Sequence, residues 1–199
     1  MEDKTSICTV RRYSGCLLHC KDLKQGHELV LLGRKSFGDR RITNVGGGML
    51  DEGEHWLPGA LRELGEETFE LLRTIVVEMV GRERMGARVH SRLYNVTIAG
   101  KLPDVAVFNA KASEALALLT KLKVDPHGIS ADKLHEIKRT TEFDRFYWVP
   151  LDGLLNAAQA YYQASDQGTK SAQPVEMEGV GVLEPSFCCL LASELKKLQ

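Results

Sequence analysis

Short apolar stretches in the first half of the chain predict a series of β-strands. Ile7 to His19 and Glu28 to Gly33 are rich in Val, Leu, Ile and Cys, and the polar segment between them, Lys21 to His27, contains a glycine. This pattern predicts a β-hairpin. Further strands are predicted at Ile42 to Val45, Thr74 to Glu83 and Val89 to Ala99, the last two as a second hairpin.

A helical period follows the glycines at Gly46, Gly47 and Gly48. Apolar and small residues recur on one stripe of this predicted helix, and carboxylates gather on a neighbouring stripe. The apolar stripe contains Leu57, Ala60, Leu61, Leu64, Thr68 and Leu71, and the acidic stripe contains Glu63, Glu66, Glu67 and Glu70. The sequence therefore predicts a helix with one face for the core and one anionic face.

The second half of the chain predicts mainly helices. Val105 to Phe108 is interpreted as one more short strand. Helices are predicted at Asn109 to Lys123 and Ser130 to Arg139, separated by the breakers Asp125 to Gly128. We also expect a core strand and the start of a helix in Phe146 to Leu155, helix continuing over Asn156 to Tyr162, a mobile loop at Ala164 to Val180, and a last helix from Pro185 to about Leu198.

The acidic stripe predicts a cation site. Like charges three and four residues apart in a helix cost a few tenths of a kcal/mol per pair, so a purely structural helix gains nothing from them. Hard divalent cations prefer oxygen ligands, which carboxylates provide. The alternative is a solvated acidic face with Lys or Arg partners. The three glycines favour the cation site, because they let the backbone approach a ligand closely.

The glycines and the acidic helix together resemble the Nudix box, G-x5-E-x7-R-E-U-x-E-E-x-G-U, in which U is bulky and aliphatic. The matching positions are Gly48, Glu54, Arg62, Glu63, Leu64, Glu66 and Glu67. Phe69 stands where the box has glycine, and Glu70 where it has an aliphatic residue. Because that glycine normally helps to end the helix, we expect the helix to continue through Phe69 to about Leu72.

The resemblance implies a fold class and a domain organisation. Family members share an α/β/α sandwich with a mixed β-sheet, and we expect that α/β fold here as a single domain over residues 1–199. Residues of about 109–140 are interpreted as a helical insertion before the last core strand, and residues of about 185–198 as a C-terminal helix.

The resemblance also implies a reaction. Nudix enzymes hydrolyse a nucleoside diphosphate linked to another group, and Mg²⁺ or Mn²⁺ is the implied cofactor. The implied metal ligands are Glu63, Glu66, Glu67 and the Gly48 carbonyl, and Glu66 or Glu67 is a candidate general base. Arg62 is expected to orient the carboxylates, and Glu54 to pair with Arg62 or to hold a metal-bound water.

One further catalytic acid and four substrate contacts are predicted outside the box. Many family members use an acid from a loop before the last strand, where this chain has Glu142 and Asp144. We select Glu142, and the alternative is that both acids are solvated near Arg139 and Arg145. Arg suits bidentate phosphate contacts, although charge on exposed hairpins is commonly solvated. The predicted substrate-binding residues are Arg34, Arg41, Arg84 and Arg88.

The substrate stays open between several classes. A phosphorylated small molecule is expected: a nucleoside triphosphate, a nucleotide sugar, a dinucleoside polyphosphate or a diphosphoinositol polyphosphate. Capped messenger RNA is a further alternative, and a non-catalytic nucleotide-binding module is an alternative of another class. A homodimer is considered because family members often dimerise.

Composition limits the partners and the compartment. The formal net charge of −1 lacks the basic excess that non-specific nucleic-acid binding requires. The five cysteines lack CxxC spacing, which argues against a zinc site and a disulfide framework and favours a reducing compartment. No apolar run approaches the length of a membrane span, and the first residues are not typical of a signal peptide. We therefore expect a cytoplasmic protein without a membrane partner.

Overall fold

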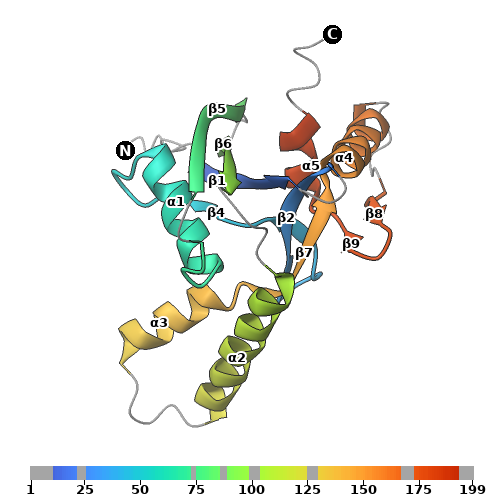
Figure 1. Cartoon of the computed structure of the whole chain (residues 1–199). Helices are drawn as coiled ribbons and strands as arrows, with labels where there is room; N and C mark the ends of the chain where they lie inside the picture. Colours follow the sequence, from blue (N-terminus) through green and yellow to red (C-terminus); the bar gives the residue numbers. More distant parts are fainter. Residues whose placement is uncertain are drawn as a thin grey trace, which may run out of the picture.

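The fold was analysed in a computed structural model, which describes residues 11–21, 26–72, 75–85, 89–98, 104–124, 130–166 and 173–192 (Figure 1). Four strands precede the first helix, and the later strands and helices are interspersed. The strands of the large sheet are β1 (Arg11–Lys21), β2 (Glu28–Lys35), β3 (Ile42–Asn44), β4 (Gly47–Met49), β5 (Ile75–Met85), β6 (Val89–Ile98) and β7 (Phe143–Pro150). The helices are α1 (Trp56–Glu67), α2 (Val105–Val124), α3 (Ala131–Thr140), α4 (Leu151–Asp166) and α5 (Pro185–Ala192).

The large sheet is mixed. Its strand order is β3-β2-β1-β6-β5, with β4 paired to β1 and β7 paired to β2. Strands β1 and β6 are parallel, whereas the other pairs in this sheet are antiparallel. The β1–β2 pair and the β5–β6 pair confirm the two predicted hairpins. A separate small pair consists of β8 (Glu176–Met177) and β9 (Gly181–Val182).

Helices cover both faces of the sheet because its central strands are apolar on both sides. In β1, Cys16, Leu18 and Cys20 join one core cluster, whereas Leu17 joins the other. This alternation follows from the two-residue period of a strand. The first cluster also contains residues of α1 and α2, and the second contains residues of α4 and α5. The predicted α/β/α sandwich with a mixed sheet is therefore confirmed.

The two helices between β6 and β7 confirm the predicted helical segment, and their far ends extend beyond the sheet (Figure 1). The predicted strand from Val105 to Phe108 is wrong, because these residues form the first turn of α2. The Asp104 side chain accepts a hydrogen bond from the Ala106 amide at 2.9 Å, as an N-cap does. Phe108 and Ala112, four residues apart, are both buried on one face of the helix.

The predicted extension of the box helix to Leu72 is also wrong. Helix α1 ends at Glu67, and Phe69 and Glu70 have φ values of 56° and 53°. The Glu70 amide donates to the Gly65 carbonyl at 2.9 Å and the Phe69 amide to the Glu66 carbonyl at 3.4 Å. These are the two hydrogen bonds of a Schellman motif. A non-glycine residue accepts the left-handed conformation here because the Phe69 ring packs against the core.

The chain end is described only in part. Residues 173–180, within the predicted mobile loop, include β8, and residues 167–172 lie outside the described residues. Helix α5 confirms the start of the last helix, and residues 193–199 lie outside the described part. Within the described residues, no helix is long and apolar enough to cross a membrane.

Candidate active site

The innermost carboxylate of the box helix belongs to Glu67, which is only 2% exposed. Its Oε2 accepts a hydrogen bond from the Gly46 amide. Its Oε1 is buried and has no hydrogen-bond partner within the described part of the chain. Burial raises the pKa of Glu67 well above its ordinary value, and the neighbouring charge of Glu142 raises it further. An ionised Glu67 at this position therefore requires a positive charge nearby.

Glu142, the residue just before β7, lies close enough to Glu67 for its charge to affect the pKa of Glu67. Its backbone carbonyl accepts a hydrogen bond of 2.7 Å from the Ser36 amide, which fixes the end of β2 against this turn. Burial raises the pKa of Glu142, while the positive charge of Lys35 opposes that shift. The structure thus brings together two predicted acids, Glu67 and Glu142, that lie far apart in the sequence.

Asp144, the other acid in this segment, has a different environment. Its carboxylate pairs with the Arg34 guanidinium, with Nε to Oδ1 at 2.7 Å, and with the Arg40 guanidinium. Burial alone would raise the pKa of Asp144, but these two hydrogen-bonded arginines lower it below its ordinary value. Asp144 is therefore held in an ion-pair cluster and is absent from the described lining of the cavity below.

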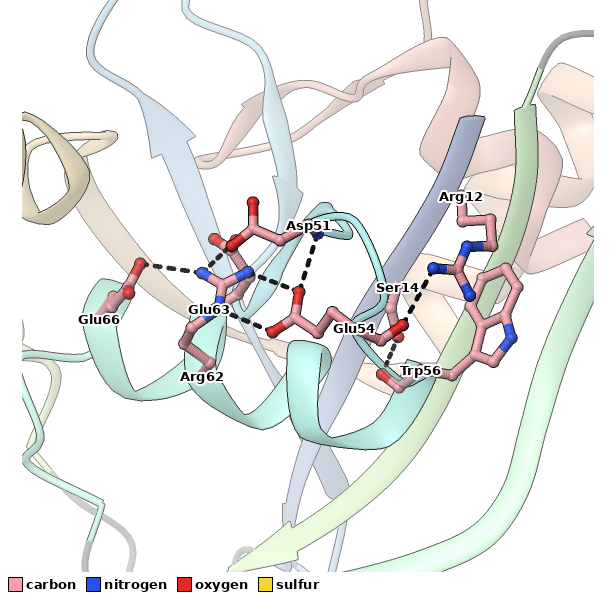
Figure 2. A network of polar contacts seen from close by, with 8 residues as sticks. All are labelled: Arg12, Ser14, Asp51, Glu54, Trp56, Arg62, Glu63 and Glu66. Atoms are coloured by element: carbon pink, nitrogen blue, oxygen red, sulfur yellow. Dashed lines mark hydrogen bonds and ion pairs between the residues drawn. The ribbon is translucent and has the colours of Figure 1, made fainter. Parts of the chain in front are cut away.

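Arg62 connects the other carboxylates of the box (Figure 2). Its Nε and Nη2 donate to the two Glu54 oxygens at 2.9 and 3.1 Å, and its Nη1 lies 2.7 Å from Glu63 Oε1 and 3.3 Å from Glu66 Oε2. The hydrogen bonds to Glu54 and Glu63 raise the pKa of Arg62 above its ordinary value. One guanidinium thus contacts three carboxylates on two turns of α1 and on the preceding loop.

The loop before α1 is fixed to strand β1 (Figure 2). The Arg12 guanidinium donates to the Glu54 backbone carbonyl at 3.0 Å, and the Ser14 hydroxyl donates to the Trp56 carbonyl at 2.5 Å. Two guanidinium groups also lie over the Trp56 ring, with the carbon of Arg12 at 5.6 Å and that of Arg92 at 5.0 Å from its centroid. These contacts set the position of Glu54, the residue that pairs with Arg62.

The glycines of the box permit close packing. A Cβ atom on Gly48 would lie 2.5 Å from the Glu63 carboxyl carbon, and one on Gly47 would lie 2.1 Å from the Tyr13 hydroxyl. Gly46 has a φ of 82°, a conformation that favours glycine. The backbone at Gly48 therefore lies directly against the Glu63 carboxylate, as a loop that shares a ligand with that carboxylate would.

A cavity of about 570 Å³ lies beside these groups. Gly48 and Glu142 belong to its wall and connect it with the box. Its described lining also includes the polar residues Tyr13, Lys35, Thr43, Asn44, Ser91, Glu184 and Ser186 and the apolar residues Met49, Phe187 and Leu190. The site therefore has room for a ligand considerably larger than a single phosphate group.

Two of the predicted substrate arginines, Arg34 and Arg41, are absent from the described lining of this cavity. Arg34 pairs with Asp144, and Arg41 Nη2 lies 3.1 Å from Asp39 Oδ2. Neither is in the described lining, so their role as substrate contacts stays a prediction. Of the other two predicted arginines, Arg84 has a described backbone only, in β5, and Arg88 lies outside the described residues.

Sequence reasoning missed Lys35, the only basic residue in the cavity lining that the structure describes. The pairing of β2 with β7 shifts register between Arg34 and Lys35, so that Arg34 faces Arg145 and Lys35 faces Phe143. A shift of this kind re-aims a side chain. The sequence offers no signal for it, because Arg34 and Lys35 are adjacent residues of similar charge.

The residues present fit a divalent cation. Glu67 has a buried oxygen without a partner among the described residues, and burial together with the charges of Glu142 and Glu63 raises its pKa. Buried carboxylates repel one another unless a cation or a proton neutralises them. Among the described residues, no three His, Cys, Asp or Glu side chains already form a complete ligand set. The contacts of Glu63 and Glu66 with Arg62 would have to loosen if these residues were ligands.

Among the comparisons with known proteins, only the comparison with solved structures found matches. No family model and no curated protein matches the sequence. An Ap4A hydrolase of C. elegans in a binary complex is 15% identical over 95% of this chain and 98% of its own, with a TM-score of 0.49.

Two further structures are similar at the same level. The NUDIX domain of Shewanella oneidensis NrtR, complexed with ADP ribose, is 15% identical over 100% of this chain and 94% of its own, with a TM-score of 0.45. The Nudix hydrolase RenU of M. smegmatis is 15% identical over 94% of this chain and 84% of its own, with a TM-score of 0.46. At such identities, the resemblance to the Nudix family rests on the box residues and their arrangement in this fold.

Proposed function

We propose that this chain is a divalent-metal-dependent hydrolase of the Nudix type, which cleaves a pyrophosphate bond in a nucleoside diphosphate linked to another group. Two observations carry the proposal. Gly48 of the box and Glu142 line one cavity, and Glu67, whose pKa the charge of Glu142 raises, has a buried oxygen without a partner among the described residues. Mg²⁺ or Mn²⁺ would be held by carboxylates of Glu63, Glu66 and Glu67 and by the Gly48 carbonyl.

When bound, the cation would neutralise phosphate charge and lower the pKa of the attacking water. The chain's own residues supply position and proton transfer. Arg62 holds the carboxylates of Glu54, Glu63 and Glu66 in place through its hydrogen bonds. Lys35 supplies a positive charge in the cavity wall for the phosphate chain.

Glu142 is our candidate for the group that accepts the proton of the attacking water. Burial raises its pKa, which brings it closer to the range suited to a general base at neutral pH. As the water oxygen bonds to phosphorus, the bridging P–O bond breaks and its electron pair leaves with the departing phosphate, and the proton passes to the Glu142 carboxylate. Glu66 and Glu67 remain the alternative bases.

The proposal is tested by measuring phosphate release from nucleoside triphosphates, nucleotide sugars, ADP-ribose, dinucleoside polyphosphates, inositol pyrophosphates and capped RNA. A coupled phosphatase makes monophosphate products visible. We expect turnover that requires Mg²⁺ or Mn²⁺ and that collapses in Glu67→Gln. Glu52→Gln is the matched control, because Glu52 is exposed and lies outside the conserved positions of the box pattern.

Two outcomes would contradict the proposal. Turnover that persists in Glu67→Gln or in excess chelator would place the chemistry elsewhere. Absence of turnover with every substrate, together with tight nucleotide binding, would favour a non-catalytic nucleotide-binding module.

A further inference from the structure

One part of the cavity wall is formed by the start of α5 and the residue before it. Glu184, Ser186, Phe187 and Leu190 line it, and none of these residues belongs to the box. Ser186 Oγ lies 3.4 Å from Glu184 Oε1, so a hydroxyl and a carboxylate stand together in this wall. Phe187 and Leu190 are nearly fully buried and give the wall an apolar surface beside these polar groups.

Backbone contacts fix this wall against strand β3. Leu183 forms a parallel bridge with Ile42, and the Glu184 amide donates to the Ile42 carbonyl at 2.8 Å. The Glu184 carbonyl in turn accepts a hydrogen bond from the Cys188 amide at 3.0 Å, and Pro185 occupies the first position of α5, where proline is favoured. The Glu184 backbone therefore has a fixed position against β3.

The sheet register separates this wall from the reacting end. Arg145, Arg34, Ile42 and Leu183 form one row across β7, β2, β3 and the segment before α5. Three strand spacings along this row correspond to roughly 14 Å. Glu142 lies three residues before one end of the row, and Glu184 one residue after the other end. A ligand whose phosphates reach Glu142 therefore presents a different group to Glu184.

The charge of the cavity wall indicates which chemical group of the ligand faces Glu184. In the described lining, Lys35 is the basic residue, whereas Glu142 and Glu184 are both acidic. A phosphate at the Glu184 end would meet a like charge, and a carboxylate prefers donors such as hydroxyl groups. Two neighbouring hydroxyls can each donate to one carboxylate, as the ribose hydroxyls of dinucleotides do to acidic residues in other folds.

We infer that Glu184, together with Ser186, binds the vicinal hydroxyls of a ribose in the part of the substrate that is not hydrolysed. The inference rests on the proposed function for the orientation of the ligand in the cavity. It makes Glu184 a specificity-determining residue that favours ribonucleotides over 2′-deoxyribonucleotides. It also disfavours inositol pyrophosphates, which carry phosphates around the whole ring.

The test is binding of ADP and 2′-deoxy-ADP, measured by calorimetry with Mg²⁺ for the wild type, Glu184→Gln and Ser186→Ala. We expect the wild type to bind ADP about 10- to 100-fold more tightly than 2′-deoxy-ADP, as for a lost hydrogen bond to a charged group. Glu184→Gln should remove most of this difference in affinity by weakening the binding of ADP. Ser186→Ala should remove a smaller part of the difference. Glu178→Gln, an exposed residue of the same segment, should leave it unchanged.

The same proteins measured with GDP, CDP and UDP distinguish the sugar from the base. A Glu184 effect that follows the base and is absent between ADP and 2′-deoxy-ADP would overturn the ribose assignment. Equal binding of both sugars by the wild type, or binding of inositol pyrophosphates that Glu184→Gln leaves unchanged and that exceeds ADP binding, would also overturn it.

Turnover measured in parallel separates this inference from the proposed function. Hydrolysis with no ribose preference would defeat the inference alone. A Glu184-dependent ribose preference without hydrolysis of any substrate would defeat the proposed function alone. Melting temperatures of the variants show whether they are folded, and a folded Glu184→Gln protein is the one from which the ratio is read.

Discussion

The outer carboxylates of the box and the inner pair are held in opposite ways. Glu54, Glu63 and Glu66 all contact the Arg62 guanidinium at 2.7 to 3.3 Å. Burial instead raises the pKa of both Glu67 and Glu142, the charge of Glu142 raises that of Glu67 further, and one Glu67 oxygen lacks a partner among the described residues. The outer set is thus stable as the protein stands, whereas the inner pair is stable only with a proton or a cation.

The largest expected effect concerns the inner pair. Because Mg²⁺ or Mn²⁺ would bind the folded state alone, a concentration of 100 times its Kd should raise the free energy of unfolding by about 2.7 kcal/mol. Glu67→Gln should remove most of this stabilisation, and Glu52→Gln should keep it. Thermal unfolding with and without the metal measures both. An equal metal effect in Glu67→Gln would mean that the inner pair does not bind the cation.

Breaking the outer set should have a smaller effect. Arg62→Lys keeps the positive charge but loses the fork that reaches both Glu54 oxygens. We expect kcat or metal affinity to fall by about 10- to 100-fold, as for other groups that orient metal ligands. Arg11→Lys is the control, since Arg11 is exposed and has no part in the proposed site. Unchanged activity in Arg62→Lys would show that the outer carboxylates need no orientation.

The inner pair should also affect how the stability of the protein depends on pH. The raised pKa values of Glu67 and Glu142 mean that the metal-free folded protein binds more protons than the unfolded chain above about pH 4.3. Its free energy of unfolding should therefore fall as the pH rises through the raised pKa values. Denaturant unfolding at several pH values checks this, and Glu67→Gln should flatten the curve. A wild-type curve that rises over this range would contradict the pKa shifts.

The smallest effect concerns the turn that ends α1. Phe69→Ala and Phe69→Gly both lose the ring, but alanine keeps a side chain in the left-handed conformation that Phe69 has now. That conformation costs alanine about 1 kcal/mol more than glycine. Phe69→Gly should therefore be more stable than Phe69→Ala by about this amount in denaturant unfolding. If Phe69→Ala were instead the more stable variant, the turn would have to rearrange when the ring is lost.

Local patterns were sufficient for much of the fold. The two hairpins followed from apolar runs separated by polar segments, and the spacing of the box residues identified the carboxylates that Arg62 contacts. The errors have local and non-local causes. Asp104 is a recognisable N-cap that would have extended α2 over the predicted strand. The end of α1 at Glu67 depends instead on core packing of Phe69, which no local pattern contains.

The cavity wall shows the limit of sequence reasoning most clearly. Glu184 reaches the site through a bridge between residues far apart in the chain, Ile42 and Leu183. Lys35 is distinguished from Arg34 by a register shift between β2 and β7. Both depend on how strands pair, and periodicity within one strand does not determine the partner of another. The carboxylates of the box were therefore predictable, whereas the groups that line the rest of the cavity were not.

The phenylalanine in the turn after α1 adds a side chain that a glycine would lack. Its ring centroid lies 6.3 Å from that of Phe146, in the strand that begins just after Glu142. The end of the helix that carries Glu67 and the strand next to Glu142 are therefore joined by one aromatic contact. Hydrocarbon packing, present before any ligand arrives, therefore links the two segments that carry these carboxylates. A cation bound by Glu67 would find the end of the helix already held in place and would cause little rearrangement of the backbone.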